Sequence, residues 1–329
     1  MPGRKLTIAI PTFNRARLLD EQLCWLARAI KGYESECELL ICDNASTDDT
    51  ADVIERHVEQ LGGGDLAVRH VVQPRNVGAI RNIIYCISNA GGEYVWTVSD
   101  DDEIDEDAVG KVLELIDANS NLALILLNFS TRHHRTGKRK FRRCFENECD
   151  ENVENGALLF EKYLAERQPS RWGGLALTTA VVYRSRDARE ALSRWPDASK
   201  NLTMQLFISG YCARNGRMAV THQPMLEMIG GRHFFESDVE LYTRFRFAQV
   251  PEAFVKLIEI GYSATLLRRK ILEVRHEVRW RFVLKMLLRR PRLIAVTARR
   301  YLASLMAAER LARRETLRRP QAPLVTSTK

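Results

Sequence analysis

No stretch of the sequence approaches the ~20 consecutive apolar residues that a helix needs to span a bilayer. The first apolar run, residues 6–10, ends at Pro11 and is too short for the core of a secretory signal. We therefore expect a cytoplasmic protein. The charge pattern described below adds the expectation that it associates peripherally with the inner face of the cell membrane.

The glycine-rich loops that bind phosphates in two common nucleotide-binding folds are also missing. No G-x-G-x-x-G sequence follows residues 6–10, which argues against a Rossmann dehydrogenase. The glycine run at residues 62–64 is not followed by Lys-Ser/Thr, so it is not a P-loop. It is interpreted as a turn.

The cysteines form no pattern typical of a disulfide framework or a zinc site. Seven of them are scattered through 329 residues whose 45% apolar content is ample for a packed core. Cys144 and Cys149 lie near His133 and His134, but their spacing does not match the usual zinc-binding arrangements. We expect a reducing compartment and no zinc at this cluster.

Acidic residues are scarce near the end of the chain. Residues 264–320 contain 17 Lys/Arg and 4 Asp/Glu, out of 50 and 42 in the whole chain. The remaining residues therefore hold 33 basic and 38 acidic side chains. The net charge of +8 hides a mildly acidic body and a strongly basic C-terminal region.

Apolar runs of strand length alternate with segments of helical periodicity through the first 130 residues. This alternation predicts an α/β protein with a parallel sheet and helices on both faces. The expected strands are 6–10, 38–42, 67–72, 94–98, 122–129 and 177–183. The expected helices are 15–31, 47–60, 76–89, 105–118, 156–166 and 202–215, with an irregular loop over 131–155. From residue 240 the chain is expected to be mainly helical, with breaks at Pro251 and Pro291.

Three consecutive aspartates, Asp100–Asp102, follow the expected strand 94–98. Ligands in parallel sheets bind beyond the carboxyl ends of the strands, where Thr12, Asp43 and Asn76 would join these aspartates. Clustered carboxylates suit Mg²⁺ or Mn²⁺, which bind protein carboxylates and phosphate oxygens together. Taken alone, an aspartate cluster here also fits a helix cap. The wider pattern favours chemistry on a diphosphate.

Four motifs carry a resemblance to a known family. They are I-A-I-P-T-F-N-R at 8–15, C-D-N-A-S-T-D-D-T at 42–50, N-V-G-A-I-R-N at 76–82, and G-E-Y at 92–94 leading to Asp100–Asp102. In order and spacing they resemble the inverting glycosyltransferases of family 2, which have the GT-A fold. Their wording is most similar to the branch that includes abequosyltransferases and related polysaccharide-building enzymes.

The resemblance implies metal-assisted transfer of a sugar, with inversion, from a nucleotide-diphosphate sugar to a saccharide or lipid-linked saccharide acceptor. It assigns Mg²⁺ or Mn²⁺ to Asp102 and Asp101, with His222 or His233 as a possible further ligand. Arg81 suits a phosphate oxygen because of its charge and its fork of donors. The full set of implied donor-binding residues is Pro11, Thr12, Asn14, Asp43, Asn44, Asn76, Arg81, Asn82, Asp100 and Asp101.

The catalytic base is the part of the family pattern that is missing. An inverting displacement needs one general base near the acceptor hydroxyl. Many family members carry an acidic pair ahead of the helix expected at 202–215, but residues 195–203 read W-P-D-A-S-K-N-L-T. Asp197 is therefore the candidate base. Asp187, Glu236 and Asp238 are weaker candidates.

The expected organisation has three parts. A GT-A domain covers 1–238, with a nucleotide-sugar-binding half at 1–130 and an acceptor half at 131–238. A basic helical region covers 239–320, and a disordered tail covers 321–329. Within 268–292, basic residues alternate with apolar ones that include Trp280 and Phe282, which fits an amphipathic helix on an anionic membrane surface. The same pattern also fits a helix packed on the catalytic body, and no nucleic-acid module accompanies it.

Two other functions remain open at this stage. A nucleotidyltransferase uses a similar sheet and metal, but usually needs a glycine-rich, arginine-containing loop after the first strand, where this chain has P-T-F-N. A nucleotide-sugar-binding or scaffold protein that has lost its base would also explain the missing acidic pair. Product formation with an acceptor separates an enzyme from a binding protein. The sequence assigns no oligomeric state, donor base or sugar.

Overall fold

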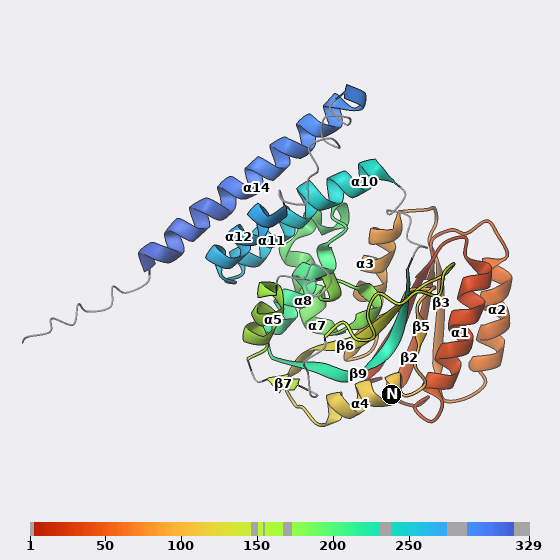
Figure 1. Cartoon of the computed structure of the whole chain (residues 1–329). Helices are drawn as coiled ribbons and strands as arrows, with labels where there is room; N and C mark the ends of the chain where they lie inside the picture. Colours follow the sequence, from red (N-terminus) through yellow and green to blue (C-terminus); the bar gives the residue numbers. More distant parts are fainter. Residues whose placement is uncertain are drawn as a thin grey trace, which may run out of the picture. The chain divides into compact units, whose positions relative to one another are not determined.

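The computed structural model describes residues 3–145, 151–153, 155–166, 173–230, 238–274 and 288–318. The chain forms two compact units, Met1–Ser237 and Asp238–Lys329. The first unit contains one large sheet with helices, and the second is helical (Figure 1).

The sheet of the first unit has the strand order β3-β2-β1-β4-β8-β6-β9-β5, and β7 also pairs with β9. The parallel strands at one end are β1 (Leu6–Thr12), β2 (Cys37–Asp43), β3 (Ala67–Val72) and β4 (Tyr94–Thr97). β8 (Val181–Arg184) runs antiparallel to β4 and to β6 (Leu122–His133), and β9 (Arg217–Gly230) runs parallel to β6. The short strands β5 (Glu103–Ile104) and β7 (Glu151–Val153) are antiparallel to β9. The prediction of a mostly parallel α/β sheet is confirmed.

Helices cover both faces of this sheet. One group consists of α1 (Ala16–Ile30), α2 (Thr50–Leu61) and α4 (Ala108–Asp117), with α1 packed against the other two (Figure 1). The other consists of α3 (Ala79–Asn89), α5 (Gly156–Ala165), α7 (Ser185–Arg194) and α8 (Met204–Arg214). The connection from β2 to β3 through α2 and the connection from β3 to β4 through α3 cross the sheet in opposite directions, so right-handed crossovers put α2 and α3 on opposite faces. Because both faces are covered, β2 is buried along its whole length and its central residues, 39–42, are apolar.

Several elements differ from the sequence-based expectation. The prediction of an irregular loop at 131–155 is wrong at both ends of this range, because β6 continues to His133 and residues 151–153 form β7. The first part of the strand expected at 177–183 is a 3₁₀ turn, η1 (Thr178–Ala180). Neither α7 nor β9 was expected. α7 has few apolar residues, and β9 contains Pro224 at an irregularity in its pairing with β6, where a proline is tolerated.

The second unit consists of α10 (Val239–Arg244), the π-helical turn η3 (Phe245–Gln249), α11 (Val250–Glu259), α12 (Ala264–Val274) and α14 (Pro291–Arg318). α14 packs along α11 and α12 (Figure 1). Pro291 begins α14, as expected from its sequence, because the first turn of a helix does not need its missing N–H. At Pro251 the chain changes from π-helix to α-helix instead of leaving the helix. Within the described ranges, no helix combines the length and the apolar content needed to cross a bilayer.

Candidate functional site

Polar side chains gather at the carboxyl ends of β1, β2 and β4. Thr12 ends β1 and donates from Oγ1 to Asp100 Oδ2 at 3.0 Å. Asp43 ends β2, and the next residue, Asn44, donates its backbone N–H to the Thr12 carbonyl at 2.9 Å. Pro11 precedes Thr12 in β1 and pairs with Cys42. The loops after these strands therefore meet where the sequence analysis expects the site.

Arg15 lies between two of the three aspartates. Its Nη1 is 2.9 Å from Asp100 Oδ1 and 2.9 Å from Asp101 Oδ2. The Ser99 hydroxyl donates to the other oxygen of Asp101 at 2.5 Å. Arg15 belongs to the quoted motif at 8–15, but its sequence position alone gave no reason to assign it a role. It partly neutralises two carboxylates that are 5% and 4% exposed.

Asp102 is enclosed by two segments that are distant in sequence. The Thr179 hydroxyl donates to Asp102 Oδ2 at 2.5 Å, and the Ile229 N–H donates to Oδ1 at 3.3 Å. Thr179 is itself fixed, since its Oγ1 accepts from Ser99 N and its carbonyl accepts from Trp96 Nε1. Thr179 carries no signal in the sequence, because a threonine next to a strand is common. Its role follows only from the antiparallel placement of β8.

Burial raises the pKa values of two of the three aspartates. Removal from water raises the pKa of Asp102 to about 7, with a smaller contribution from the Asp101 charge and an opposing one from the Thr179 hydrogen bond. Burial also raises the pKa of Asp100 to about 6, against the opposing effect of Arg15. Both carboxyl groups would gain from further positive charge nearby, because it favours their ionised forms.

The chemistry of the triplet fits Mg²⁺ or Mn²⁺, whose preferred ligands are oxygens. Among the residues that the structure describes, the three carboxylates do not form a group with one oxygen each within 4.8 Å of one another. This arrangement fits a cation that takes one or two protein carboxylates and completes its shell with phosphate oxygens and water.

The loops after β2 and β3 are cross-linked by side-chain amides. Asn44 donates from Nδ2 to Asn76 Oδ1 at 2.9 Å and accepts the Val77 N–H on Oδ1 at 2.8 Å. Asp43 accepts the Ser46 hydroxyl at 2.5 Å. Asn44 and Asn76, two predicted donor-binding residues from motifs 32 positions apart, thus lie in direct contact. Their hydrogen bonds fix the shape of this wall of the site.

Two residues in the loops after β1 and β2 have a left-handed backbone. Asn14 has φ 50° and Ala45 has φ 63°, a region that side chains disfavour. Asn14 accepts the Thr47 N–H on Oδ1 at 2.7 Å and donates its backbone N–H to Ser46 Oγ at 2.8 Å. Strain of this kind persists where surrounding contacts hold it, and it is common at ligand sites.

The two predicted donor-binding residues at the start of α3 have different environments. Asn82 is 1% exposed, donates from Nδ2 to the Cys42 carbonyl at 2.7 Å and accepts from Gln73 Nε2 at 3.3 Å. It joins α3 to β2 and β3. Arg81 is exposed and keeps its guanidinium in solvent. Of these two, Asn82 would have to break these hydrogen bonds to contact a ligand, whereas Arg81 is exposed.

The predicted base and histidine ligands lie outside the aspartate cluster or outside the described residues. Asp197 lies in the 3₁₀ turn η2 (Pro196–Lys200), its side chain is 69% exposed, and it pairs with Lys200 at 2.7 Å. His222 lies on β9, where Arg143 Nη1 is 3.0 Å from its Nε2. His233 and Glu236 fall outside the described residues.

The two weaker base candidates that can be located have structural contacts. Asp187 is buried in an ion pair with Arg184, which ends β8 opposite the first residue of β4. It is therefore at the edge of the sheet away from the aspartates. Asp238 caps α10 by accepting the N–H groups of Glu240 and Leu241.

Gln205 is a further polar residue that the sequence reading did not single out. It lies in the first turn of α8 and donates from Nε2 to Thr178 Oγ1 at 3.0 Å, next to the residue that holds Asp102. Within the described part of the chain its buried Oε1 has no hydrogen-bond partner. An unpaired buried acceptor costs about 1–3 kcal/mol, which makes Gln205 a candidate for contact with a ligand hydroxyl.

Comparison with known proteins finds a family and several relatives. The sequence model described as "Glycosyl transferase family 2" matches residues 7–173. The chain is 29% identical over 119 residues to the abequosyltransferase RfbV of Salmonella typhimurium, which is 36% of this chain and 34% of that protein. It is 30% identical over 115 residues to a GalNAc(5)-diNAcBac-PP-undecaprenol beta-1,3-glucosyltransferase of Campylobacter jejuni, which is 33% of this chain and 34% of that protein. The matches span about a third of the length of these relatives.

Solved structures share the fold at low sequence identity. Residues 1–349 of S. aureus TarS align with a TM-score of 0.62 and 17% identity over 93% of this chain and 82% of that one. The same protein has been solved with UDP-GlcNAc, with a TM-score of 0.53 and 20% identity over 82% of this chain and 66% of that one. The mannosyltransferase PcManGT from Pyrobaculum calidifontis was solved with GDP-Man and Mn²⁺. It aligns with a TM-score of 0.51 and 15% identity over 95% of this chain and 88% of that one.

Proposed function

Because the chain belongs to glycosyl transferase family 2, we propose that it transfers a sugar, with inversion, from a nucleotide-diphosphate sugar to an acceptor hydroxyl. The observation that carries this proposal is the aspartate triplet beyond β4, in contact with the loop after β1 and enclosed by Thr179 and Ile229. The named relatives support synthesis of a surface polysaccharide or glycolipid, with a saccharide or lipid-linked saccharide as the acceptor.

The donor is proposed to bind across the ends of β1, β2 and β4. Asp43 and Asn44 are held by their loops in position to meet a nucleobase. The exposed fork of Arg81 suits a phosphate oxygen. Asp101 and Asp102 would hold Mg²⁺ or Mn²⁺, which supplies a Lewis acid for the charge that develops on the departing nucleoside diphosphate.

Arg15 and Asp197 are proposed to have different roles, Arg15 at the aspartate cluster and Asp197 at the acceptor. Arg15 contacts both Asp100 and Asp101 and holds them in place, and its charge lowers the pKa of Asp100 against the larger effect of desolvation. Asp197 remains the candidate base that takes the proton from the acceptor hydroxyl. Its exposed carboxylate leaves room for a large acceptor, and its turn packs against α3 and α7.

A thermal-shift panel of UDP-, GDP-, CDP- and dTDP-sugars with and without Mn²⁺ tests this proposal. One base class is expected to raise the melting temperature by about 5 °C at a hundredfold excess over Kd, and only with the cation. The shift should be larger at pH 8 than at pH 6. Asp102, with a pKa of about 7, is mainly protonated at the lower pH and binds a cation poorly.

Nucleoside monophosphates are the matched control, since they present the same bases without a diphosphate to share the cation. Their shifts should not depend on Mn²⁺. No shift with any sugar donor, at either pH, would contradict donor binding. A shift without product formation in the presence of an acceptor would favour a binding protein over an enzyme.

We further propose that the second unit contacts an anionic membrane surface through α14. Much of the basic segment that motivates this prediction in the sequence, residues 275–287, lies outside the described residues. α14 supplies its own cationic face. Its two acidic residues are engaged within the unit, Glu309 by Arg268 and Arg313, and Glu315 by the Ala264 N–H.

The exposed residues of the described segment 288–317 include no Asp or Glu. Arg292, Arg299, Met306 and Arg313 recur every seven positions and so share one side of α14 with Leu302 and Leu317. The exposed large apolar side chains are Leu288, Val296, Leu302, Met306 and Leu317. Exposed arginines between apolar side chains are typical of a helix at a membrane interface.

Sedimentation with vesicles tests this surface. The double variant Arg299→Glu with Arg313→Glu should bind vesicles of anionic phospholipid at least about tenfold more weakly, since each basic residue contributes about 1 kcal/mol near such a surface. Arg17→Glu with Arg28→Glu, on α1, makes the same change in net charge and should bind like the wild type. Equal binding by both double variants, or equal binding of the wild type to neutral vesicles, would contradict the proposal.

A further inference from the structure

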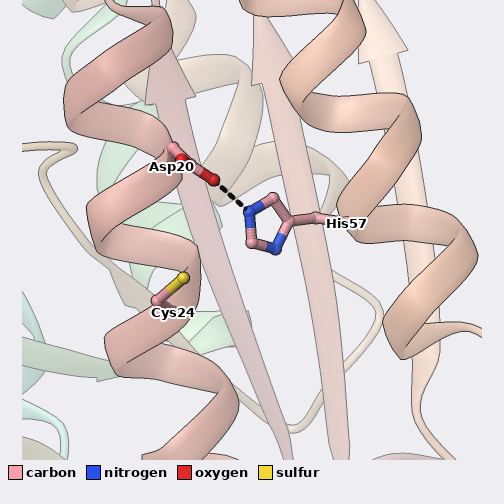
Figure 2. A group of neighbouring side chains, drawn as sticks. All are labelled: Asp20, Cys24 and His57. Atoms are coloured by element: carbon pink, nitrogen blue, oxygen red, sulfur yellow. Dashed lines mark hydrogen bonds and ion pairs between the residues drawn. The ribbon is translucent and has the colours of Figure 1, made fainter.

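A second group of metal-binding side chains lies between α1 and α2. Asp20 and Cys24 are four residues apart on α1 and therefore share one face of that helix. His57 reaches toward them from α2, as Figure 2 shows. One ligand atom from each of the three residues lies within 4.8 Å of the others. Three different kinds of ligand, a carboxylate, a thiol and an imidazole, thus converge on one point.

The present contacts of these side chains leave ligand atoms available. His57 is 5% exposed, and its Nε2 is 2.6 Å from Asp20 Oδ1. The guanidinium of Arg56 contacts the same oxygen at 3.0 Å, so both interactions use Oδ1. Cys24 is the one exposed thiol among the cysteines that the structure describes. Solvent can therefore reach the group from the Cys24 side.

The ligand types indicate which cation suits this group. Thiolate and imidazole favour Zn²⁺ and related transition metals, whereas Mg²⁺ and Ca²⁺ prefer oxygen. In a tetrahedral zinc site with Zn–S of about 2.3 Å and Zn–N of about 2.0 Å, neighbouring ligand atoms lie roughly 3.3–3.6 Å apart. The observed group reaches this spacing if Cys24 moves inward and the His57–Asp20 contact opens by less than about 1 Å.

We propose that Asp20, Cys24 and His57 form a binding site for a Zn²⁺-class cation, with water as the fourth ligand. The bound ion would join α1 to α2. The loops that precede these helices are already connected, since Asp48 accepts the N–H groups of both Ala16 and Thr50. The ion would therefore stabilise the pair of helices whose leading loops line the donor site, without itself contacting the donor.

The His57–Asp20 hydrogen bond would hold the two helices together without any metal. Substitution of Cys24 distinguishes this purely structural role from a metal site. The hydrogen bond does not involve the thiol. Cys24→Ser should therefore leave the melting temperature unchanged in EDTA and remove the stabilisation that Zn²⁺ gives to the wild type. An unchanged response to Zn²⁺ in Cys24→Ser would overturn the proposal.

Titration of the full-length, EDTA-treated chain with Co²⁺ gives a direct readout, because a thiolate bound to Co²⁺ produces a charge-transfer band in the near ultraviolet. The band should appear in the wild type and disappear in Cys24→Ser. Co²⁺ affinity should fall at least about tenfold in His57→Ala. It should rise in Arg56→Ala, which removes a competing cation from Asp20, and a fall there would contradict the assignment.

Asp102→Asn keeps this experiment independent of the proposed donor site. The aspartate triplet has no thiol, so the variant should lose Mn²⁺-dependent donor binding and keep the Co²⁺ band. A wild type without the band, or a band that persists in Cys24→Ser, would overturn the second metal site whatever the outcome at the first.

Discussion

Asp102→Asn is expected to lower the rate of sugar transfer by about a thousandfold while the protein stays folded. Loss of a Lewis acid at a departing diphosphate removes several kcal/mol of transition-state stabilisation, and each 1.36 kcal/mol corresponds to about a tenfold change in rate. The amide keeps the shape of the carboxyl group; its oxygen can accept the Ile229 N–H while its NH₂ donates to the Thr179 hydroxyl, which then acts as acceptor. The measurement is release of nucleoside diphosphate with Mn²⁺, beside a thermal melt of the same sample.

Asp105→Asn is the matched control for this prediction. Asp105 is exposed three residues further along and accepts the Asp107 N–H, so its substitution makes the same change in charge outside the cluster. It should leave the transfer rate within about twofold of the wild type, in line with a surface change of at most about 0.5 kcal/mol. Full activity in Asp102→Asn would contradict its assignment as a metal ligand.

Arg15→Ala should reduce the free energy of unfolding of the metal-free protein by about 2–3 kcal/mol at pH 8. Removing one partner of a buried ion pair costs about 3–5 kcal/mol, and we discount this because the Arg15 side chain is 30% exposed. Mn²⁺ should restore part of the loss, since it supplies positive charge to the same carboxylates. Urea unfolding with and without Mn²⁺ measures both effects.

The loss in Arg15→Ala should be smaller at pH 5 than at pH 8. Without the guanidinium, the pKa of Asp100, already about 6, rises further, so this carboxyl is protonated at pH 5 and does not itself bury an unpaired charge. An acid whose pKa is raised by folding contributes stability below its unfolded pKa, and this contribution is lost as the pH rises through the folded value. Arg17→Ala, which removes an exposed arginine from α1 two residues further along, should change stability by less than about 0.5 kcal/mol at either pH. Equal effects of the two substitutions would contradict the role given to Arg15.

The sequence predicts those strands and helices in which the buried positions show as apolar runs or as apolar residues at regular spacing. β1 and β2 are mostly apolar because both faces of the sheet are covered, and their expected positions agree with the structure to within about two residues. β9 escapes prediction because Pro224 and its polar neighbours interrupt the apolar pattern, and only its pairing with β6 accommodates that break. α7 escapes because it has few apolar residues on which periodicity can be recognised.

In the candidate site, too, some residues can be predicted from the sequence and others cannot. Thr12, Asp43 and the aspartate triplet can be found from sequence because each lies at or just beyond the carboxyl end of a strand, and parallel strands bring such positions together. Thr179 and the Ile229 N–H cannot be found in this way, because their contacts with Asp102 depend on how β8 and β9 cross the sheet. Asn82 shows the opposite case, since its motif position suggests ligand contact and its amide is used within the protein.

The two residues that enclose Asp102 lie 77 and 127 residues beyond it in the sequence. During biosynthesis, the first strands can therefore pair before the surroundings of Asp102 are complete. A chain that emerges from the ribosome N-terminus first can pair β1 to β4 while the later strands are still being made. Asp102 acquires its native surroundings only after β9 has been synthesised and has joined the sheet. Nascent chains that end before Ile229 would therefore carry an incomplete carboxylate site, and the proposed sugar transfer would begin only on a chain that has nearly finished folding its first unit.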